Sequence, residues 1–333
     1  MNRGRLLRIV VLFGVPALLV WLIAPTLGSV RVSILRALDT SIPFDRNVDA
    51  QILFVARLPR TVAGIVVGAA LAAAGVVFQG LLRNPLATPY TLGVSAGAAL
   101  GAMLAITLRW TIAAGPYSAV PLAAFAGSLA AVMVVYGLAT MRARRALSTH
   151  VLLLAGVTLN SFFSALILCV QYFASFADAF RAIRWLMGDL DISSYRPIGA
   201  ALPLLAVAGI AFAWLPRALN VLTFGAEAAE ARGIDVTRAQ RVAFFSASMA
   251  TGAAVSIGGP IGFVGIIVPH LVRLLVGSDH RAVLIASVLF GGAFLVACDT
   301  IARTVLAPIE LPVGVVTALI GGPFFLWLLI ARR

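Results

Sequence analysis

Residues 61–82 read TVAGIVVGAALAAAGVVFQGLL, a long run that contains no charged side chain. A transmembrane helix needs about 20 consecutive apolar residues, and this run has that length. Gly64 and Gly68 lie four residues apart, so one face of the expected helix is nearly bare and lets a neighbouring backbone approach closely. The run therefore predicts a tightly packed transmembrane helix.

The composition of the whole chain extends this prediction. Of its 333 residues, 62% are hydrophobic and 11% are charged, whereas a soluble domain is about 45–50% apolar and about 25% charged. So much apolar surface excludes a soluble enzyme, and only two cysteines exclude a disulfide-rich scaffold. The formal charge of +13 comes from arginine alone, at the edges of apolar blocks. Flanking cations of this kind orient membrane spans and do not indicate a nucleic-acid partner.

Apolar blocks between charges and Pro or Gly breaks predict an all-α, polytopic membrane protein with ten transmembrane helices in one domain, residues 1–333. The expected spans are Ile9–Leu27, Thr61–Leu82, Leu92–Leu108, Ala119–Thr140, Thr149–Phe173, Pro197–Leu215, Gln240–Ile257, Gly262–Gly277, Ala282–Val305 and Val313–Ala331. The third and eighth spans are short, and each follows a proline break, Asn84-Pro85 or Gly259-Pro260.

The first span begins after Arg3-Gly-Arg5 and could be mistaken for a secretory signal. Its apolar run is about twenty residues long and no A-x-A-like cleavage site follows, so we expect a retained span. Ten spans put both termini on one side, and the loops on that side then hold the larger share of arginines. We therefore expect cytoplasmic N- and C-termini.

Several kinds of catalytic site are missing. Without lysine there is no Walker A motif for ATP, the three histidines lack metal-ligand spacing, and no nucleophile is paired with a base. We therefore expect that the protein is not an enzyme and holds no metal site.

Among the carboxylates, only that of Asp299 lies within an expected span, four residues before Arg303. This spacing allows either an ion pair shielded from lipid or a functional role. One carboxylate is a weak basis for an ion-coupled secondary transporter, which stays the less favoured alternative.

The inner loop Arg217–Arg241 has the pattern of an ordered segment. Ala226–Arg232 favours a helix that Gly233 ends, and Thr237 with Gln240 resembles a capping box. Apolar residues ahead of this helix are expected on the water side: Leu219, Leu222 and Phe224. Such a segment suits docking to a soluble subunit, with a solvated loop as the alternative.

Arginines at the outer ends of two spans also need a reason. Arg57 and Arg60 precede the second span, and Arg303 ends the ninth. A ring of guanidinium groups would bind an acidic partner through bidentate contacts; phospholipid headgroups are the alternative.

Several motifs along the chain then resemble the FecCD family, the permease subunits of ABC importers for ferric siderophores, haem and vitamin B12. These motifs are Arg57-Leu-Pro-Arg60-Thr61, Gln79-Gly80-Leu81-Leu82-Arg83-Asn84-Pro85-Leu86-Ala87, Leu92-Gly93-Val94-Ser95-Ala96-Gly97, Leu153-Leu154-Ala155-Gly156-Val157, Trp185-Leu186-Met187-Gly188, Gly259-Pro260-Ile261-Gly262-Phe263-Val264-Gly265, Val268-Pro269-His270 and Glu310-Leu311-Pro312-Val313-Gly314-Val315-Val316-Thr317. The resemblance covers nearly the whole chain.

The resemblance implies the type II ABC importer permease fold in the bacterial inner membrane, as a homodimer. The translocation path would run along the dimer interface beside the fifth and tenth spans. Two cytoplasmic ATPase subunits, which carry ATP and Mg, would dock below, and a periplasmic substrate-binding protein above. Membrane lipid surrounds the assembly, and the permease itself needs no cofactor.

The resemblance also assigns residues to roles. Arg57, Arg60 and Arg303 match positions that pair with the binding protein. The ATPase-coupling segment, about residues 217–239, includes Leu219, Leu222, Phe224, Gly225, Glu227, Ala228, Glu230, Ala231 and Gly233. The cytoplasmic gate matches Asn84, Leu86, Ser148 and Thr149. We expect Asn160, Ser161 and Ser164 to give the pore a weakly polar lining, although such residues also form hydrogen bonds between helices.

We expect the cargo to be a metal chelate, with a ferric siderophore as the main hypothesis and haem or cobalamin as the alternative. The chain departs from related permeases after Met187-Gly188, where Asp189 and Asp191 add negative charge near the outer mouth.

Overall fold

The computed structural model describes residues 3–111, 118–141 and 149–331, and the regular structure in these ranges is helical. Each of the ten expected spans falls on a helix. These helices are α1 (Arg3–Ile23), α4 (Leu58–Leu82), α5 (Val94–Thr107), α6 (Ala119–Met141), α7 (Thr149–Phe173), α9 (Arg196–Leu222), α11 (Val236–Gly258), α12 (Val264–Val276), α13 (His280–Thr304) and α14 (Val313–Ala331).

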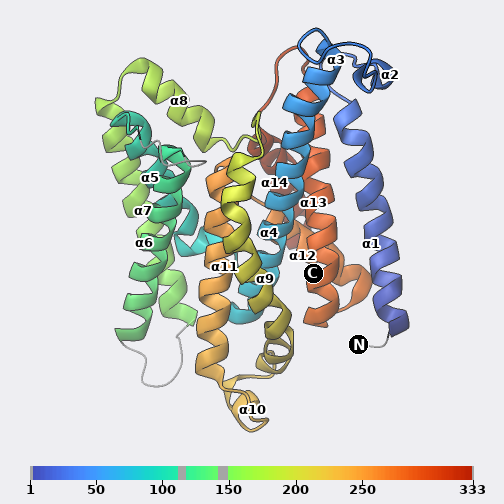
Figure 1. Cartoon of the computed structure of the whole chain (residues 1–333). Helices are drawn as coiled ribbons and strands as arrows, with labels where there is room; N and C mark the ends of the chain where they lie inside the picture. The colour runs from blue at the N-terminus through green and yellow to red at the C-terminus, as the bar shows by residue number, and fades with distance from the viewer. Residues whose placement is uncertain (1–2, 112–117, 142–148, 332–333) are drawn as a thin grey trace.

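Short helices gather at the two ends of this bundle (Figure 1). One end carries α2 (Ile34–Ala37), α3 (Val48–Gln51) and α8 (Phe176–Leu186), and we call it the α8 end. The opposite end carries α10 (Ala226–Glu230), and we call it the α10 end. Three further turns are the 3-10 helices η1 (Ala24–Thr26) and η3 (Pro89–Leu92) and the π-helical η2 (Ile52–Arg57).

Helix α4 forms the centre of the bundle, where it packs against α9, α11, α12 and α13. Its glycines allow backbone-to-backbone contact: a Cβ atom at Gly68 would lie 2.3 Å from the Gly291 carbonyl oxygen, and one at Gly75 would lie 2.1 Å from that of Gly265. Of the most apolar stretch of the Val48–Leu82 span, 78% is buried, against 17% for the α7 span. The quoted run is therefore the core helix of the protein.

Among the described residues, six helices are long and apolar enough to cross a membrane, and α5, α12 and the apolar part of α14 are shorter. The short third and eighth spans are confirmed, because α5 has 14 residues and α12 has 13.

Helix α11 is more polar than the other long helices. Its polar side chains are tolerated because protein surrounds the helix. The hydroxyl groups of Ser246 and Thr251 are satisfied within the helix, by the carbonyl oxygens of Val242 (2.6 Å) and Ala247 (2.8 Å).

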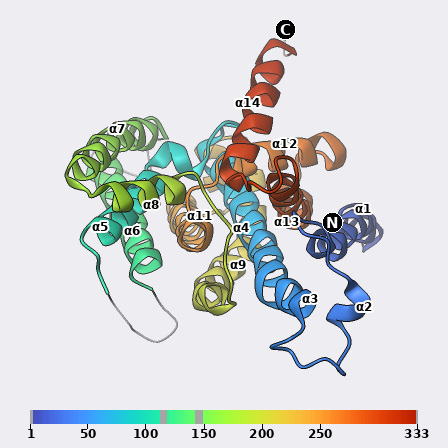
Figure 2. The same cartoon turned by 90° about the horizontal axis from the view of Figure 1, so that it is seen from above.

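Two helices lie at the margin of the bundle. Helix α7 packs on α5, α6 and η3, and leaves side chains such as Leu154 (70% exposed) and Tyr172 (85% exposed) uncovered. Helix α14 contacts only α12 and α13 extensively and projects away from the other helices (Figure 2). Like α1, whose apolar stretch is also only 17% buried, these two helices have apolar faces that the other described helices leave uncovered.

Candidate functional site

A buried ionic cluster joins α4 and α13 at the α8 end. The Arg60 Nε atom lies 2.9 Å from Asp299 Oδ1, and its Nη1 atom lies 2.6 Å from Glu310 Oε2. Arg303 Nε lies 3.0 Å from Asp299 Oδ2, an ion pair by distance in which the N–H does not point along a hydrogen bond. The Asp299–Arg303 ion pair, one of the two alternatives that the sequence leaves open, is present, and Arg60 and Glu310 extend it.

The arginines also hold the chain that follows α1. Arg57 donates hydrogen bonds to the carbonyl oxygens of Pro25 (3.2 Å), Thr26 (3.1 Å) and Val30. Arg303 donates to the carbonyl oxygens of Leu27 (3.1 Å) and Ala24 (3.3 Å). The guanidinium groups thus supply donors to the backbone carbonyl groups of residues 24–30, of which the Ala24 carbonyl also accepts the Leu27 amide (3.2 Å).

The expected open ring of guanidinium groups is therefore wrong for this conformation. Arg57, Arg60 and Arg303 are 5%, 5% and 3% exposed, respectively. Their partners come from segments that the sequence places far away, such as residues 24–30 and 305–312, and these segments cover them. Within the cluster, the carboxylate of Glu310 is the member that reaches solvent, with 41% of its side chain exposed.

Helix α8 is fixed at its N-terminus by a second charged group. Asp178 is buried, accepts a hydrogen bond from the Ser175 hydroxyl group (2.7 Å), and pairs with Arg109 Nη2 at 3.0 Å. The Ser175 hydrogen bond and then Arg109 hold the pKa of Asp178 below its usual range. An anion in the first turn also favours the helix, because helix N-termini carry partial positive charge.

The expected pore residues on α7 are only partly brought together. Asn160 and Ser164 line an open cavity of about 620 Å³ between α7, the start of α5 and α8, together with Tyr90, Gln171 and Leu186. Asn160 also donates a hydrogen bond to the Tyr90 carbonyl oxygen (2.7 Å), so it joins α7 to η3. Ser161 is exposed and bonds back to Val157 on its own helix (3.2 Å). The structure therefore shows both alternatives: Asn160 and Ser164 line a cavity, and Asn160 also joins two helices.

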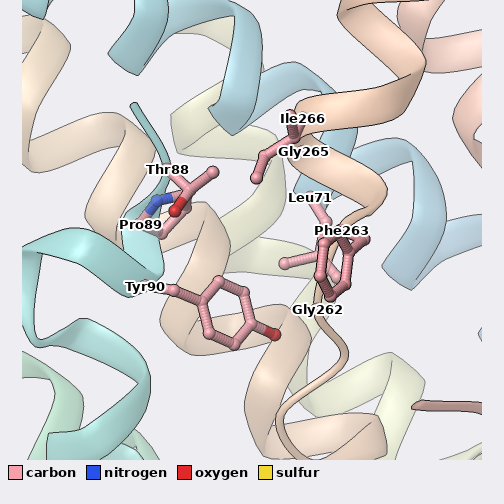
Figure 3. Close-up of a pocket in the computed structure, with 8 residues that line it drawn as sticks. All are labelled: Leu71, Thr88, Pro89, Tyr90, Gly262, Phe263, Gly265 and Ile266. Atoms are coloured by element: carbon pink, nitrogen blue, oxygen red, sulfur yellow. The ribbon is translucent and has the colours of Figure 1, made fainter. Parts of the chain in front are cut away.

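Two unwound stretches meet inside the bundle and enclose a smaller cavity (Figure 3). The cavity, about 210 Å³, is lined from one side by Thr88, Pro89 and Tyr90 and from the other by Gly262 and Phe263, with α4 and α12 completing it. These stretches follow the expected proline breaks. Irregular backbone at membrane depth needs protein or water around it, and here both stretches are enclosed by helices.

The expected gate residues that the structure describes, Asn84, Leu86 and Thr149, lie at the α10 end (Figure 1). The Asn84 Oδ1 atom accepts a hydrogen bond from the Leu86 amide (2.9 Å), in a turn that starts where Arg83 ends α4 with a φ of 49°. Leu86 is 36% exposed. Thr149 begins α7, and Ser148 lies outside the described residues.

The expected coupling segment needs two corrections. Helix α9 continues through Pro216 to Leu222, so Leu219 and Leu222 are buried (1% and 5% exposed) rather than facing water. The cap of α11 is Asp235, whose carboxylate accepts the Arg238 amide at 2.9 Å, and not Thr237. Packing against α4, α11 and α13 outweighed the helix-breaking tendency of the proline.

The rest of the segment has the expected form. Phe224 is 71% exposed, and Arg232 lies over its ring at 5.4 Å from the centroid. Gly225 and Gly233, with φ values of 109° and 75°, bracket α10 and allow its sharp entry and exit. The exposed residues Glu227, Glu230 and Ala231 lie on α10 and its C-terminal turn, with Ala228 half-buried between them.

A polar junction beside this segment has no counterpart in the sequence predictions. The Asn220 side chain donates to Asp279 Oδ1 (2.9 Å) and accepts the His280 amide (2.9 Å), so it joins the end of α9 to the start of α13. Burial alone would raise the pKa of Asp279, but the Asn220 hydrogen bond and the charges of Arg5 and Arg281 outweigh it and lower the pKa. A lone asparagine near a loop gave no signal of this contact.

Known proteins share this architecture. A solved structure described as an inward-facing conformation of a metal-chelate type ABC transporter superposes with a TM-score of 0.81 at 29% identity, covering 98% of this chain and 99% of that one. The PsaBC structure from Streptococcus pneumoniae shares the fold, with a TM-score of 0.53 at 16% identity, covering 80% of this chain and 88% of that one.

Sequence relatives match over similar lengths. The chain is 48% identical to the cobalamin import system permease protein BtuC of Halobacterium salinarum, covering 83% of this chain and 73% of the relative. It is 39% identical to the vitamin B12 import system permease protein of Escherichia coli (83% of each chain). It is 38% identical to the hemin transport system permease protein HmuU of Yersinia pestis (83% and 82%).

The profile of the FecCD transport family matches residues 16–331. Members of this family are membrane permeases whose ATPase is a separate subunit, which agrees with the missing Walker A motif. The protein is thus a transport subunit of an ABC importer, without a cofactor or enzymatic activity of its own, and it belongs to the FecCD family.

Proposed function

We propose that the chain imports a corrinoid such as cobalamin, with haem as the second candidate and ferric siderophores after them. The observation that carries the proposal is the 48% identity to a cobalamin permease, above the 38% identity to a hemin permease. This order reverses the order expected from the sequence alone. The permease itself contributes a weakly polar path, so selectivity for the chelate belongs to the binding protein.

We propose further that two copies of this single transmembrane domain enclose the path. The uncovered faces of α7 and α14 support this arrangement, because they leave room for a second copy beside the two helices expected to flank the path. Asn160, Ser161 and Ser164 would line the path, and Asn84, Leu86, Ser148 and Thr149 would close it at the α10 end.

In this proposal the α10 end and both termini face the cytoplasm. Phe224, α10 and Gly233 then present the surface that docks the ATPase, while Leu219 and Leu222 anchor that surface in the core. The binding protein docks at the α8 end, where Arg57, Arg60 and Arg303 supply positive charge beneath Glu310. ATP binding on the partner would move the docked segment and open the path alternately to each side.

The test is uptake into liposomes that contain the permease, its partner ATPase and the matching binding protein. We expect ATP-dependent accumulation of cyanocobalamin, slower uptake of haem and little uptake of a ferric siderophore. Preferential siderophore uptake would contradict the choice of cargo. Uphill accumulation by the permease alone, without nucleotide, would instead support the ion-coupled alternative.

A further inference from the structure

Glu310 stands between the buried arginines and solvent at the α8 end. Three arginines, Arg57, Arg60 and Arg303, meet two carboxylates, so the group as a whole keeps a positive charge. Arg60 has 6% of its side chain exposed and Asp299 has 2%, whereas Glu310 has 41%. An anion that approaches from solvent therefore meets the Glu310 carboxylate before it can reach Arg60.

The two bonds of Arg60 differ in how easily they exchange. Asp299 is enclosed between Arg60 and Arg303, and breaking its pairs would leave buried charges without partners. Glu310 is half solvated, so an incoming carboxylate can replace it on Arg60 Nη1 with little loss of solvation. The Arg60–Glu310 contact is the exchangeable one.

Glu310 also belongs to the link between α13 and α14, residues 305–312. The Leu311 amide donates to the Ala302 carbonyl oxygen (3.0 Å), and the Gly314 amide donates to that of Gly188 (3.2 Å). Gly314 lies so close to the turn that ends α8 that a Cβ atom there would be 2.1 Å from the Met187 carbonyl oxygen. A shift of Glu310 would therefore act on the start of α14 and on the turn that ends α8.

We propose that Glu310 occupies, in the undocked chain, the place that an acidic side chain of the docking protein takes on Arg60. Docking then exchanges an internal carboxylate for an external one and frees the 305–312 link, which leads into α14. The inference rests on the proposed function, because it assigns the partner's acidic group a specific arginine and an internal competitor. It also accounts for Arg60, which is buried yet lies at the expected docking end.

The central test compares E310Q with the parent chain in the complete transporter. E310Q keeps the side-chain shape and removes the charge, so the matching binding protein no longer displaces a carboxylate. We expect its affinity to rise about tenfold at low salt, with the gain shrinking as salt is added. E310D, which keeps the charge but shortens the reach, should lie between E310Q and the parent chain.

D191N is the matched control. Asp191 is exposed at the same end, carries the same charge and forms no ion pair among the described residues. An equal gain in D191N and E310Q would mean only a general field effect and would overturn the proposal. An unchanged or weaker affinity in E310Q would overturn it as well.

Hydrogen exchange of the permease without any partner provides a second readout. Amides of residues 305–312 should exchange several-fold faster in E310Q than in the parent chain, and at the parent rate in D191N. Equal exchange in all three proteins would overturn the link release. If the parent chain itself fails to capture the binding protein, the proposed function is wrong; if it does capture the protein and E310Q changes nothing, only the exchange is wrong.

Discussion

Arg60 and Asp299 form the contact whose loss should cost most at the scale of single residues. Both side chains are almost fully buried, and Asp299 is shared with Arg303. Removing one partner of a buried pair leaves an uncompensated charge in a medium of low polarity, and this costs more than the pair itself contributes. The ionic cluster should therefore tolerate substitution of Glu310 but not substitution of Asp299.

The first prediction follows from this difference. We expect D299A to lower the free energy of unfolding by about 3–5 kcal/mol, because two guanidinium groups lose their buried counter-charge. E310Q should cost less than about 1 kcal/mol, since Glu310 itself is partly solvated and Arg60 keeps its pair with Asp299. Thermal unfolding of both variants in the same detergent measures this, and equal losses would contradict the assignment of Asp299 as the central group.

Only part of this cluster could be predicted from the sequence. Asp299 and Arg303 are four residues apart on one helix, so their pairing follows from helix geometry. Arg60 meets its two carboxylates across 239 and 250 residues of chain, and no local pattern encodes such a contact. The burial of Arg57 was missed for the same reason, because its acceptors are carbonyl oxygens of a distant loop.

At the scale of helices, boundaries were predicted well where composition changes abruptly. The end of α7 at Phe173 and the start of α14 at Val313 agree with the expected spans residue for residue, and at α14 the preceding Pro312 marks the boundary. The end of α9 was missed, since Pro216 was taken as a break and only the packing of Leu219 and Leu222 carries the helix past it. Capping rules also fit both Asp235 and Thr237, and tertiary structure selected Asp235.

The second prediction concerns the contact of α4 with α12. G75A would place a methyl group 2.1 Å from the Gly265 carbonyl oxygen, so the helices must separate. We expect a loss of about 1–3 kcal/mol in the free energy of unfolding. The matched control is G137A in α6, where the added methyl group meets nothing within 4 Å, and helix propensity predicts a gain of about 0.5–1 kcal/mol. A similar effect of both substitutions on thermal unfolding would refute the close contact.

The third prediction concerns how far Asp178 stabilises α8 at different pH values. Because the pKa of Asp178 is lowered in the folded chain, its stabilising effect is complete above the unfolded value of about 4 and is lost as pH falls through the folded value. Amide protection of α8, corrected for intrinsic rates, should stay constant from about pH 7 to pH 5. D178N should lower it at every pH in this range, whereas D39N, in an exposed loop, should not. Equal protection in D178N and the parent chain would remove Asp178 from this role.

At the scale of the whole molecule, charge-rich contacts at the α8 end and the protruding α10 segment lie at opposite ends of the bundle (Figure 1). A conformational change at one end can reach the other only through the helices between them. Helix α9 is one continuous element that ends at the α10 segment. Asn220 joins its last turns to α13, which carries Asp299 and Arg303 at the far end. This connection places both proposed docking ends on the same pair of helices.

The fourth prediction tests transmission from the α10 end. Replacing Glu227-Ala228-Ala229-Glu230 with four glycines should dissolve α10, because each glycine costs a helix about 1 kcal/mol relative to alanine. We expect ATP hydrolysis by the assembled transporter to continue while cobalamin uptake per ATP falls at least about tenfold. The double substitution E227Q/E230Q keeps the helix and should retain most coupling. Normal uptake per ATP in the glycine variant would exclude this segment as the point of transmission.

The glycine contacts of α4 have a practical consequence for spectroscopy. Two helices whose main chains touch, as at Gly68 and Gly291, cannot slide past each other without collision. Spin labels attached to the outer faces of α4 and α13 should therefore report one unchanging separation throughout a turnover cycle. Helices α4 and α13 can therefore serve as a fixed reference against which displacements of α7 and α14 are measured.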